Sequence, residues 1–347
     1  MLREPAGGVA RRGILAIGNL LVDKMHRIGA YPAESMLEVI TESSMSPGGG
    51  VLNVLFDLAV VDPTLPLAAA GLVGRDEDGA YLQSECERRH IDARRIAVLD
   101  DAPTSFTHVM ISRSNATRTF FHAHGANARL GLDQFRAIES SARIAHVAYL
   151  LILQGLDVAG GPCGSRGAEA LKILRDKGFV TSLDLISDPD PTRYGEIVRP
   201  ALAHTDYLIV NDVEAANLTG LAKVTAGAEV DWDLARRQAA TLIDMGVSSV
   251  VAIHFPEGAV AMSRSGDSVA LPSYRVPKAE VVSALGAGDA FCAGLLYGLH
   301  ESCALETCVK LGAALAHFNL FAASATDGAV SRDRLFSYIA ERDRSGT

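Results

Sequence analysis

The chain has 347 residues, of which 48% are hydrophobic and 32 are glycine, enough for one large α/β domain or two unequal ones. Its formal net charge of −9 argues against nucleic acid or an anionic membrane as a main partner. No apolar run is long enough to span a membrane, and the first dozen residues lack the apolar segment of a signal peptide. Five cysteines without a C-x-x-C pair indicate a reducing compartment, so we expect a cytoplasmic protein.

The first predicted strand is Ile14–Gly18, and Asp23 follows shortly after its end. Ligands of open α/β sheets bind at the carboxyl ends of the strands. Asp23 is therefore a candidate for hydrogen-bonding a polar substrate. An aspartate that caps a turn is an equally good interpretation.

A glycine run, Gly48-Gly49-Gly50, joins a short predicted strand over Leu37–Thr41 to a predicted helix over Val51–Val61. Asn53 lies in the first turns of that helix, where its helix propensity is poor. Glycines that let a substrate approach the backbone, with Asn53 directed at its hydroxyl groups, would explain both features.

Two later stretches, Thr104–Ile111 and Thr117–His122, alternate in the manner of a β-hairpin and could form a small separate sheet with Leu37–Thr41. His122 and His124 suggest a metal site there. A histidine pair without a third ligand is more typical of a polar sheet face.

From Ala145 onward, strands and helices alternate with short connections. The predicted strands are Val147–Ile152, Phe179–Leu185, Tyr207–Val210 and Val250–Ile253, and the predicted helices are Gly164–Lys177, Thr192–Ala203 and Trp232–Met245. This alternation predicts a mostly parallel sheet with helices on both faces.

Asn211 and Glu214 lie three residues apart at the start of another helix. This spacing matches an N-cap with its capping-box glutamate. In the functional alternative, Glu214 holds Mg²⁺ through water and Asn211 donates to a phosphate oxygen.

The stretch Gly286-Ala287-Gly288-Asp289 precedes an apolar helix. A helix start with free N–H groups and small side chains is a site for an anion. A carboxylate there would repel a phosphate, so Asp289 suggests a base that accepts a proton from an attacking hydroxyl group. The alternative is an ordinary tight turn. The stretch matches neither G-x-G-x-x-G nor G-x-x-x-x-G-K-[ST].

The order of these features resembles the ribokinase or PfkB carbohydrate kinase family. The motifs that carry the resemblance are Asp23, Gly48-Gly49 with Asn53, Gly74-x-Asp76, Asn211-x-x-Glu214 and Gly286-Ala287-Gly288-Asp289. The resemblance implies a three-layer α/β/α domain over residues 13–345, with a β-sheet lid formed by about 24–46 and 103–124.

The resemblance also implies ATP and Mg²⁺ as cofactors and a role for each motif. By this likeness Asp289 is the base, and the anion hole is formed by Gly286, Ala287 and Gly288. The acceptor is bound by Asp23, Gly48, Gly49 and Asn53. The phosphates and Mg²⁺ are served by Asn211 and Glu214, Gly258 belongs to the segment at the nucleotide phosphates, and His317 lies beside the adenine.

Three positions depart from the family pattern. Ser283-Ala284 stands where the family has Asp-Thr, so activation by a monovalent cation is not predicted. Ile253-His254-Phe255 replaces Thr-x-Gly, and a phenylalanine there would crowd the nucleotide phosphates. Leu21 replaces an asparagine common in ribokinase-like members, which argues against ribose as the acceptor.

We therefore predict an ATP-dependent, Mg²⁺-requiring kinase that phosphorylates a hydroxymethyl group of a sugar or sugar-like small molecule. The alternatives are a nucleoside kinase of the same family and a catalytically weakened protein that binds a sugar or a nucleotide. We also expect a homodimer formed through the lid, with Phe106, Val109 and Phe120 as exposed apolar positions.

Overall fold

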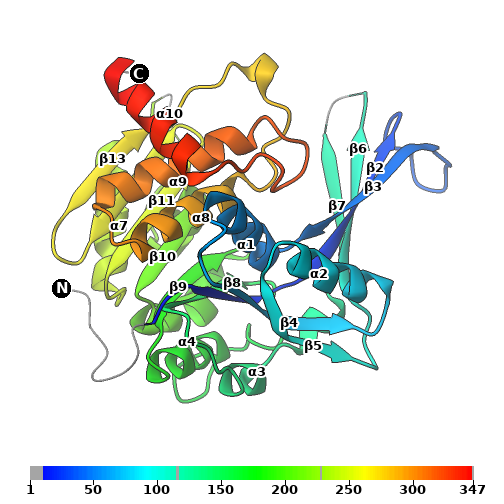
Figure 1. Cartoon of the computed structure of the whole chain (residues 1–347), viewed down its shortest axis with the longest axis horizontal. Helices are drawn as coiled ribbons and strands as arrows, with labels where there is room; N and C mark the ends of the chain where they lie inside the picture. The colour runs from blue at the N-terminus through cyan, green and yellow to red at the C-terminus, as the bar shows by residue number, and fades with distance from the viewer. Residues whose placement is uncertain (1–10, 115–116, 227–228, 346–347) are drawn as a thin grey trace.

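The computed structural model describes residues 11–114, 117–226 and 229–345. Figure 1 shows one large sheet with helices on both sides and a small second sheet that projects from it. Within the described residues, no helix combines the length and the hydrophobicity needed to cross a membrane.

The large sheet has nine strands in the order β13-β12-β11-β10-β9-β8-β1-β4-β5. Their bounds are β1 (Ile14–Gly18), β4 (Leu67–Gly74), β5 (Asp92–Leu99), β8 (Ile144–Leu150), β9 (Val180–Leu185), β10 (Tyr207–Asn211), β11 (Val250–Phe255), β12 (Gly258–Ser263) and β13 (Ser268–Pro272). Neighbouring strands from β5 to β11 are parallel, and β12 and β13 join antiparallel. Burial on both faces explains why β1 and β4 are apolar or small throughout.

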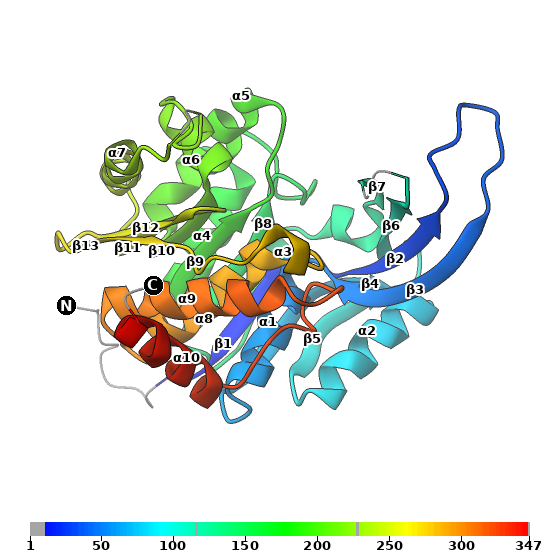
Figure 2. The ribbon, with the colours of Figure 1, turned by 90° about the horizontal axis from the view of Figure 1, so that it is seen from above.

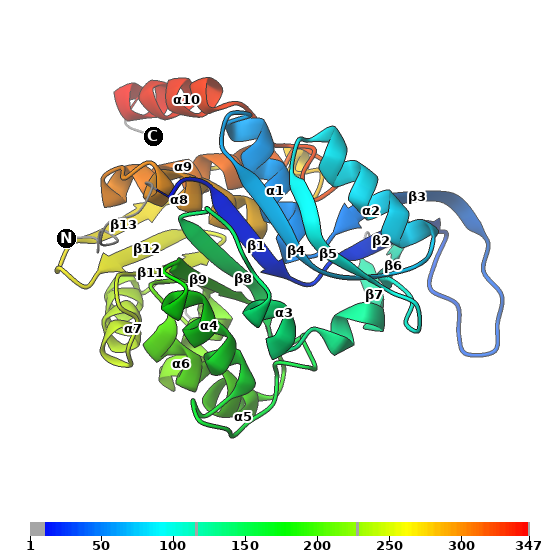
Figure 3. The same ribbon diagram turned by 60° about the horizontal axis from the view of Figure 1, so that its bottom comes forward.

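Helices cover the two faces, as Figure 3 shows. One face carries α1 (Gly50–Val61), α2 (Glu77–Arg88), α8 (Ala287–His300), α9 (Leu305–Asn319) and α10 (Arg332–Ser345), and the other carries α3 (Leu132–Arg136), α4 (Arg166–Asp176), α6 (Asp212–Thr219) and α7 (Trp232–Asp244). Alternate residues of β1 enter the two cores: Ile14 and Ala16 pack with the first group of helices, and Leu15 and Ile17 with the second. The predicted three-layer α/β/α architecture is confirmed.

The small sheet contains β2 (Leu21–Ile28), β3 (Ile40–Gly48), β6 (Ser105–Ser112) and β7 (Arg118–Ala123), in the order β3-β2-β6-β7. Figure 2 shows it as a curved ribbon that leaves one end of the large sheet. The strand predicted over Leu37–Thr41 begins instead at Ile40 and continues to Gly48. The polar run after Thr41 is a strand because β2 pairs with it from Leu21 to Ile28.

The predicted helix Thr192–Ala203 is helical over its whole length, but it is not one regular α-helix. The segment forms three short pieces: α5 (Pro191–Arg193), a π turn over Tyr194–Val198 and a 3₁₀ turn over Arg199–His204. Pro200 explains the interruption, because proline has no N–H to donate and its ring obstructs the preceding turn of an α-helix.

The order in which strands are added to the large sheet reverses between β1 and β8, although the two strands are parallel. From β1 the next strands, β4 and β5, are added on one side, whereas β8 to β11 are added on the other. The carboxyl ends of β1 and β8 therefore border a crevice of the kind in which open α/β sheets bind ligands.

Candidate active site

Helix α8 begins at this crevice with a free N-terminus. Its N-cap, Gly286, has φ of 76°, and a Cβ there would lie 2.5 Å from the carbonyl oxygen of Ala325. No side chain caps the helix. The Ala287 N–H donates to the Ala284 carbonyl at 3.3 Å, which leaves the N–H groups of Gly288 and Asp289 as the donors that face outward. The helix start is therefore a candidate anion site, in which the Ala287 N–H is already engaged, and the anion-hole role of Gly286, Ala287 and Gly288 stays a prediction.

Asp289, in the first turn of α8, is held by two hydrogen bonds. Asn53 Nδ2 donates to one carboxylate oxygen at 2.8 Å, and the Tyr149 hydroxyl donates to the other at 2.6 Å. Burial raises the pKa of Asp289, and the bonds from Tyr149 and Asn53 oppose that rise. The carboxylate is thus oriented and more basic than a free aspartate.

Sequence reasoning missed Tyr149. It lies at the carboxyl end of β8, where the edge argument applied to Asp23 could have found it. The third glycine of the glycine run makes room for it, because a Cβ on Gly50 would lie 2.6 Å from the Tyr149 ring.

The glycine run also shapes the acceptor side. A Cβ on Gly48 would lie 2.3 Å from a carboxylate oxygen of Asp23, so this glycine lets Asp23 fold against β3. Gly49 has φ of 86°, and a Cβ there would meet the Asn19 carbonyl at 2.5 Å. The predicted acceptor residues Asp23, Gly48, Gly49 and Asn53 are therefore brought together beside Asp289.

Several carboxyl groups crowd this crevice. Burial and the nearby Asp289 raise the pKa of Asp23 to about 7. Asp57, one turn beyond Asn53 in α1, is buried with no hydrogen bond to either carboxyl oxygen within the described residues, and burial raises its pKa well above the ordinary value. Burial, Glu214 and Asp289 likewise raise the pKa of Asp184. Such a crowd of acidic groups favours binding of protons or cations.

Asn211 and Glu214 form the capping box that their spacing predicts. The Asn211 side chain accepts from the N–H groups of Val213 and Glu214, while Glu214 accepts from the Asn211 backbone N–H at 2.9 Å and from Ser187 at 2.8 Å. Burial raises the pKa of Glu214 to about 7. The capping interpretation is thus present in the structure, and a role towards Mg²⁺ stays a prediction.

The segment predicted to crowd the nucleotide phosphates is arranged differently. Phe255 is buried and packs on Trp232, with ring centroids 5.5 Å apart, so its ring turns away from α8. His254 faces the helix start instead: its Cε1 lies 3.2 Å from the position of a Cβ on Gly288. Alternation along β11 could have revealed this, because neighbouring residues of a strand point to opposite sides.

Gly258 and His317 were also assigned to the nucleotide. A Cβ on Gly258 would lie 2.4 Å from the Leu271 carbonyl and 2.5 Å from Trp232, which explains the glycine by packing. His317 is buried near the end of α9, stacks on Tyr338 at 4.9 Å and bonds its hydroxyl at 3.0 Å. Among the described residues, neither Gly258 nor His317 is hydrogen-bonded to Asp289, Asn53 or Tyr149. Their nucleotide roles stay predictions.

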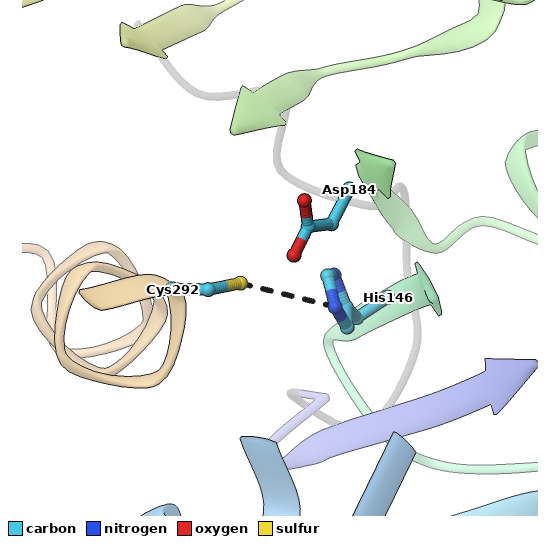
Figure 4. A group of neighbouring side chains, drawn as sticks. All are labelled: His146, Asp184 and Cys292. Carbon is cyan, nitrogen blue, oxygen red and sulfur yellow. Dashed lines mark hydrogen bonds between the residues drawn. The ribbon is translucent and has the colours of Figure 1, made fainter. Parts of the chain in front are cut away.

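Three buried side chains lie beneath Asp289. Figure 4 shows His146, Asp184 and Cys292 pointing toward one another, with Cys292 Sγ 3.8 Å from His146 Nε2. Their possible ligand atoms all lie within 4.8 Å of one another. A mixed nitrogen, sulfur and oxygen set suits a zinc-like ion better than Mg²⁺, which prefers oxygen alone. As a set of three, these side chains therefore do not match a magnesium site, although the oxygens of Asp184 alone would suit that ion.

The histidine pair of the small sheet has no such third ligand among the described residues. His122 shares a hydrogen bond of 3.0 Å with Thr107, and its ring packs edge-on against His124 at 4.9 Å. His124 lies beyond the end of β7 rather than in the strand.

Comparisons with known proteins agree with this architecture. A family model described as pfkB family carbohydrate kinase matches residues 13–331. A 5-dehydro-2-deoxygluconokinase of Listeria monocytogenes is 24% identical over 208 residues, which are 56% of this chain and 58% of that protein. The chain thus spans little more than half the length of that relative. A protein of the same name from Lacticaseibacillus casei is 23% identical over 338 residues, 94% of this chain and 95% of that protein.

A nucleoside kinase of Methanothermobacter thermautotrophicus is 24% identical over 309 residues, 88% of this chain and 89% of that protein. Among solved structures, Arabidopsis thaliana ribokinase complexed with ribose and ATP has a TM-score of 0.76 at 20% identity, over 95% of this chain and 99% of that chain. At this level of identity the structure comparison shows a shared fold. Because the family model covers nearly the whole chain, the protein belongs to the pfkB family of carbohydrate kinases.

Proposed function

We propose that this protein is an ATP-dependent kinase that transfers the γ-phosphoryl group to a hydroxymethyl group of a sugar or sugar-like small molecule. The observation that carries the proposal is the position of Asp289. Asp289 lies in the first turn of α8, at its uncapped N-terminus, and its carboxylate accepts hydrogen bonds from Asn53 and Tyr149.

In this mechanism Asp289 accepts the proton of the acceptor hydroxyl as its oxygen attacks the γ-phosphorus. The new O–P bond forms while the bond from the γ-phosphorus to the β–γ bridging oxygen breaks, and ADP leaves. A positioned base contributes about 10²- to 10⁴-fold to the rate. The free N–H groups at the start of α8, those of Gly288 and Asp289, would stabilise the transferred charge, and such a donor is worth about 10²- to 10³-fold.

Asp23 and Asn53 bind the acceptor in this proposal. Asn53 Nδ2 is engaged by Asp289, but its Oδ1 is buried without a hydrogen-bond partner among the described residues. An acceptor hydroxyl could donate to that oxygen, which supports this role because buried polar atoms are rarely left unpaired.

Mg²⁺ fits the acidic character of the crevice. Asp184 and Glu214 are buried carboxyl groups that form no ion pair within the described residues, and each oxygen is a suitable partner for Mg²⁺ or its bound water. When bound, Mg²⁺ would neutralise charge on the phosphates during transfer. Glu214 would hold the ion through a bound water, and Asn211 would donate to a phosphate oxygen.

Two substitutions of Glu214 separate this role from helix capping. Glutamine can keep the capping box, because it also accepts a hydrogen bond at that position, whereas alanine cannot. We expect Glu214→Gln to keep the melting temperature near that of the wild type but to raise the Mg²⁺ concentration for half-maximal activity severalfold. Glu214→Ala should change both. An unchanged Mg²⁺ dependence in Glu214→Gln would reject the Mg²⁺ role and leave helix capping as the function of Glu214.

We further infer that the small sheet is a lid over the acceptor, that the protein works in the cytoplasm and that two lids pair in a homodimer. Five free cysteines support a reducing compartment. Exposed Met45, Phe120 and Phe121 on the small sheet support pairing. Of the other apolar positions expected there, Val109 is buried.

The test is ADP formation by the purified protein with ATP, Mg²⁺ and a panel of sugars, sugar derivatives and nucleosides. Turnover with a compound that carries a free hydroxymethyl group supports the proposal. Turnover with nucleosides alone would favour the nucleoside kinase, the alternative supported by the similarity to the Methanothermobacter nucleoside kinase. Binding of a sugar without ADP release from any acceptor would identify a weakened binding protein.

A further inference from the structure

A cavity of about 580 Å³ lies between the small sheet and two segments of the large domain. Met25, Arg27 and Arg118 line it from the sheet, and Val282 and Ala323 line it from the opposite side. Val282 lies shortly before α8 in the chain. Its N–H donates to the carbonyl of Leu320, just beyond the end of α9. The cavity is therefore walled by the sheet on one side and by the segments that flank α8 and α9 on the other.

The cavity lies farther out along the face of the small sheet that carries Asp23. Asp23, Met25 and Arg27 alternate along β2, so their side chains emerge on the same face of the sheet. Ile111 of β6 pairs with both Arg27 and Arg118, which places Arg118 on this face as well. Four residues of a strand span about 13 Å, so the arginines lie roughly one small-molecule length from Asp23.

Positive charge dominates this outer end. Arg27, Arg113 and Arg118 all line the cavity, and Glu42 is the acidic side chain among its lining residues. Glu42 pairs with Arg27 at 3.0 Å. Within the described residues neither Arg113 nor Arg118 forms an ion pair. Arg113 is exposed and Arg118 is partly buried, so in a chain with a net charge of −9 both guanidinium groups are available to an anionic ligand.

Guanidinium groups bind carboxylates and phosphates through paired, charge-assisted hydrogen bonds. We propose that the acceptor carries an anionic group at the end remote from its phosphorylated hydroxymethyl group, and that Arg27, Arg113 and Arg118 hold this group. The acceptor is then a sugar acid or a sugar phosphate rather than a neutral sugar. This inference rests on the proposed kinase function for the position of the hydroxymethyl group.

Matched pairs of compounds test it by binding rather than by turnover. Gluconate and sorbitol differ in a carboxylate against a hydroxymethyl group, and fructose 6-phosphate and fructose differ in the phosphate. Affinities for the full chain are measured by calorimetry with a non-hydrolysable ATP analogue and Mg²⁺. We expect at least one anion to bind about 10- to 100-fold more tightly than its neutral partner. The pair that shows the preference distinguishes carboxylate from phosphate.

Substitutions locate the preference. Arg118→Gln and Arg113→Gln should each reduce the anion preference about tenfold and leave the affinity for the neutral partner unchanged, and Arg118→Lys should keep part of it. Glu42→Gln should strengthen anion binding, because it frees Arg27. Arg236→Ala, on the exposed side of α7, is the matched control and should change nothing.

The two proposals fail separately. Equal affinity for the anionic and neutral members of both pairs, or a preference that survives the double substitution Arg113→Gln/Arg118→Gln, would overturn the inference while kinase activity on a neutral sugar could still stand. Anion binding that depends on these arginines, without ADP release from any compound, would support the inference and reject the kinase. Circular dichroism of each variant checks that a lost preference reflects the arginine and not the fold.

Discussion

Replacing Asp289 with asparagine tests the base directly, because the surroundings can keep their shape. The carboxylate accepts hydrogen bonds from Asn53 and from the Tyr149 hydroxyl. An asparagine at position 289 can still accept from Asn53 through its oxygen, while its NH₂ group donates to the Tyr149 hydroxyl oxygen, since a hydroxyl both donates and accepts. Geometry and volume are thus preserved, and only the proton acceptor is lost.

The expected loss in kcat is about 10²- to 10⁴-fold, which is the contribution of a positioned general base. The stability should change in the opposite direction. Burial raises the pKa of Asp289, so at neutral pH the charged form is costly in the folded protein, and Asp289→Asn removes that cost. The substitution also removes the charge that raises the pKa of Asp23.

The assay is steady-state ADP release, together with acceptor affinity by calorimetry and a thermal melt. We expect kcat to fall, the acceptor dissociation constant to stay within a few fold, and the melting temperature to hold or rise. In the wild type, kcat/KM should fall as the pH drops through the raised pKa of Asp289, since only the carboxylate accepts a proton. A variant with near wild-type kcat would refute the role of Asp289, and a misfolded variant would refute the account of its surroundings.

Four further substitutions probe the surrounding residues. Tyr149→Phe removes a donor that stabilises the carboxylate, so the pKa of Asp289 should rise, the acidic limb of the kcat/KM profile should move to higher pH and kcat should fall about tenfold; an unmoved limb would contradict this. His254 faces the start of α8, so His254→Ala should raise the KM for ATP without changing acceptor affinity. Phe255 packs in the core instead, so Phe255→Ala should lower the free energy of unfolding by about 3 kcal/mol, measured by urea titration. Asp23 has a folded pKa of about 7 and a lower unfolded pKa, so its contribution to stability is present below about pH 4 and is lost as the pH rises toward 7. Asp23→Asn should therefore stabilise the free protein at pH 8 by about 1 kcal/mol or more, and a pH-independent difference in melts would refute the shift.

The periodicity of the sequence was sufficient for most of the large sheet. Buried parallel strands such as Ile14–Gly18 and Val250–Phe255 are short apolar runs that end in polar residues, and this pattern is local. The strands that were missed or displaced are different. β2 and β3 carry polar and charged residues along most of their length, and they are strands because they pair with each other rather than because of their composition.

The candidate site divides in a similar way. Local signals marked Asp289, Asn53 and Asp23 one at a time, because each follows a glycine-rich stretch or a strand end, and the resemblance to the PfkB family joined them into one functional group. Tyr149 also lies at a strand end, but an aromatic residue in an apolar strand usually packs in the core, so its position alone did not single it out. Its role depends on a contact with a residue 140 positions away, to which local patterns give no access.

The two ends of the acceptor side carry opposite charges. At its inner end, the buried carboxyl groups of Asp23 and Asp289 lie beside the free N-terminus of α8, and at its outer end Arg118 lies on the same sheet face as Asp23. An acceptor with a neutral hydroxymethyl group at one end and an anion at the other would find these ends unequal. In the reversed orientation its anion would meet Asp23, a like charge near the reacting centre. The same charges that retain an anionic acceptor would thus choose which of its hydroxyl groups reaches Asp289, so substituting Arg118 should reduce regioselectivity together with affinity.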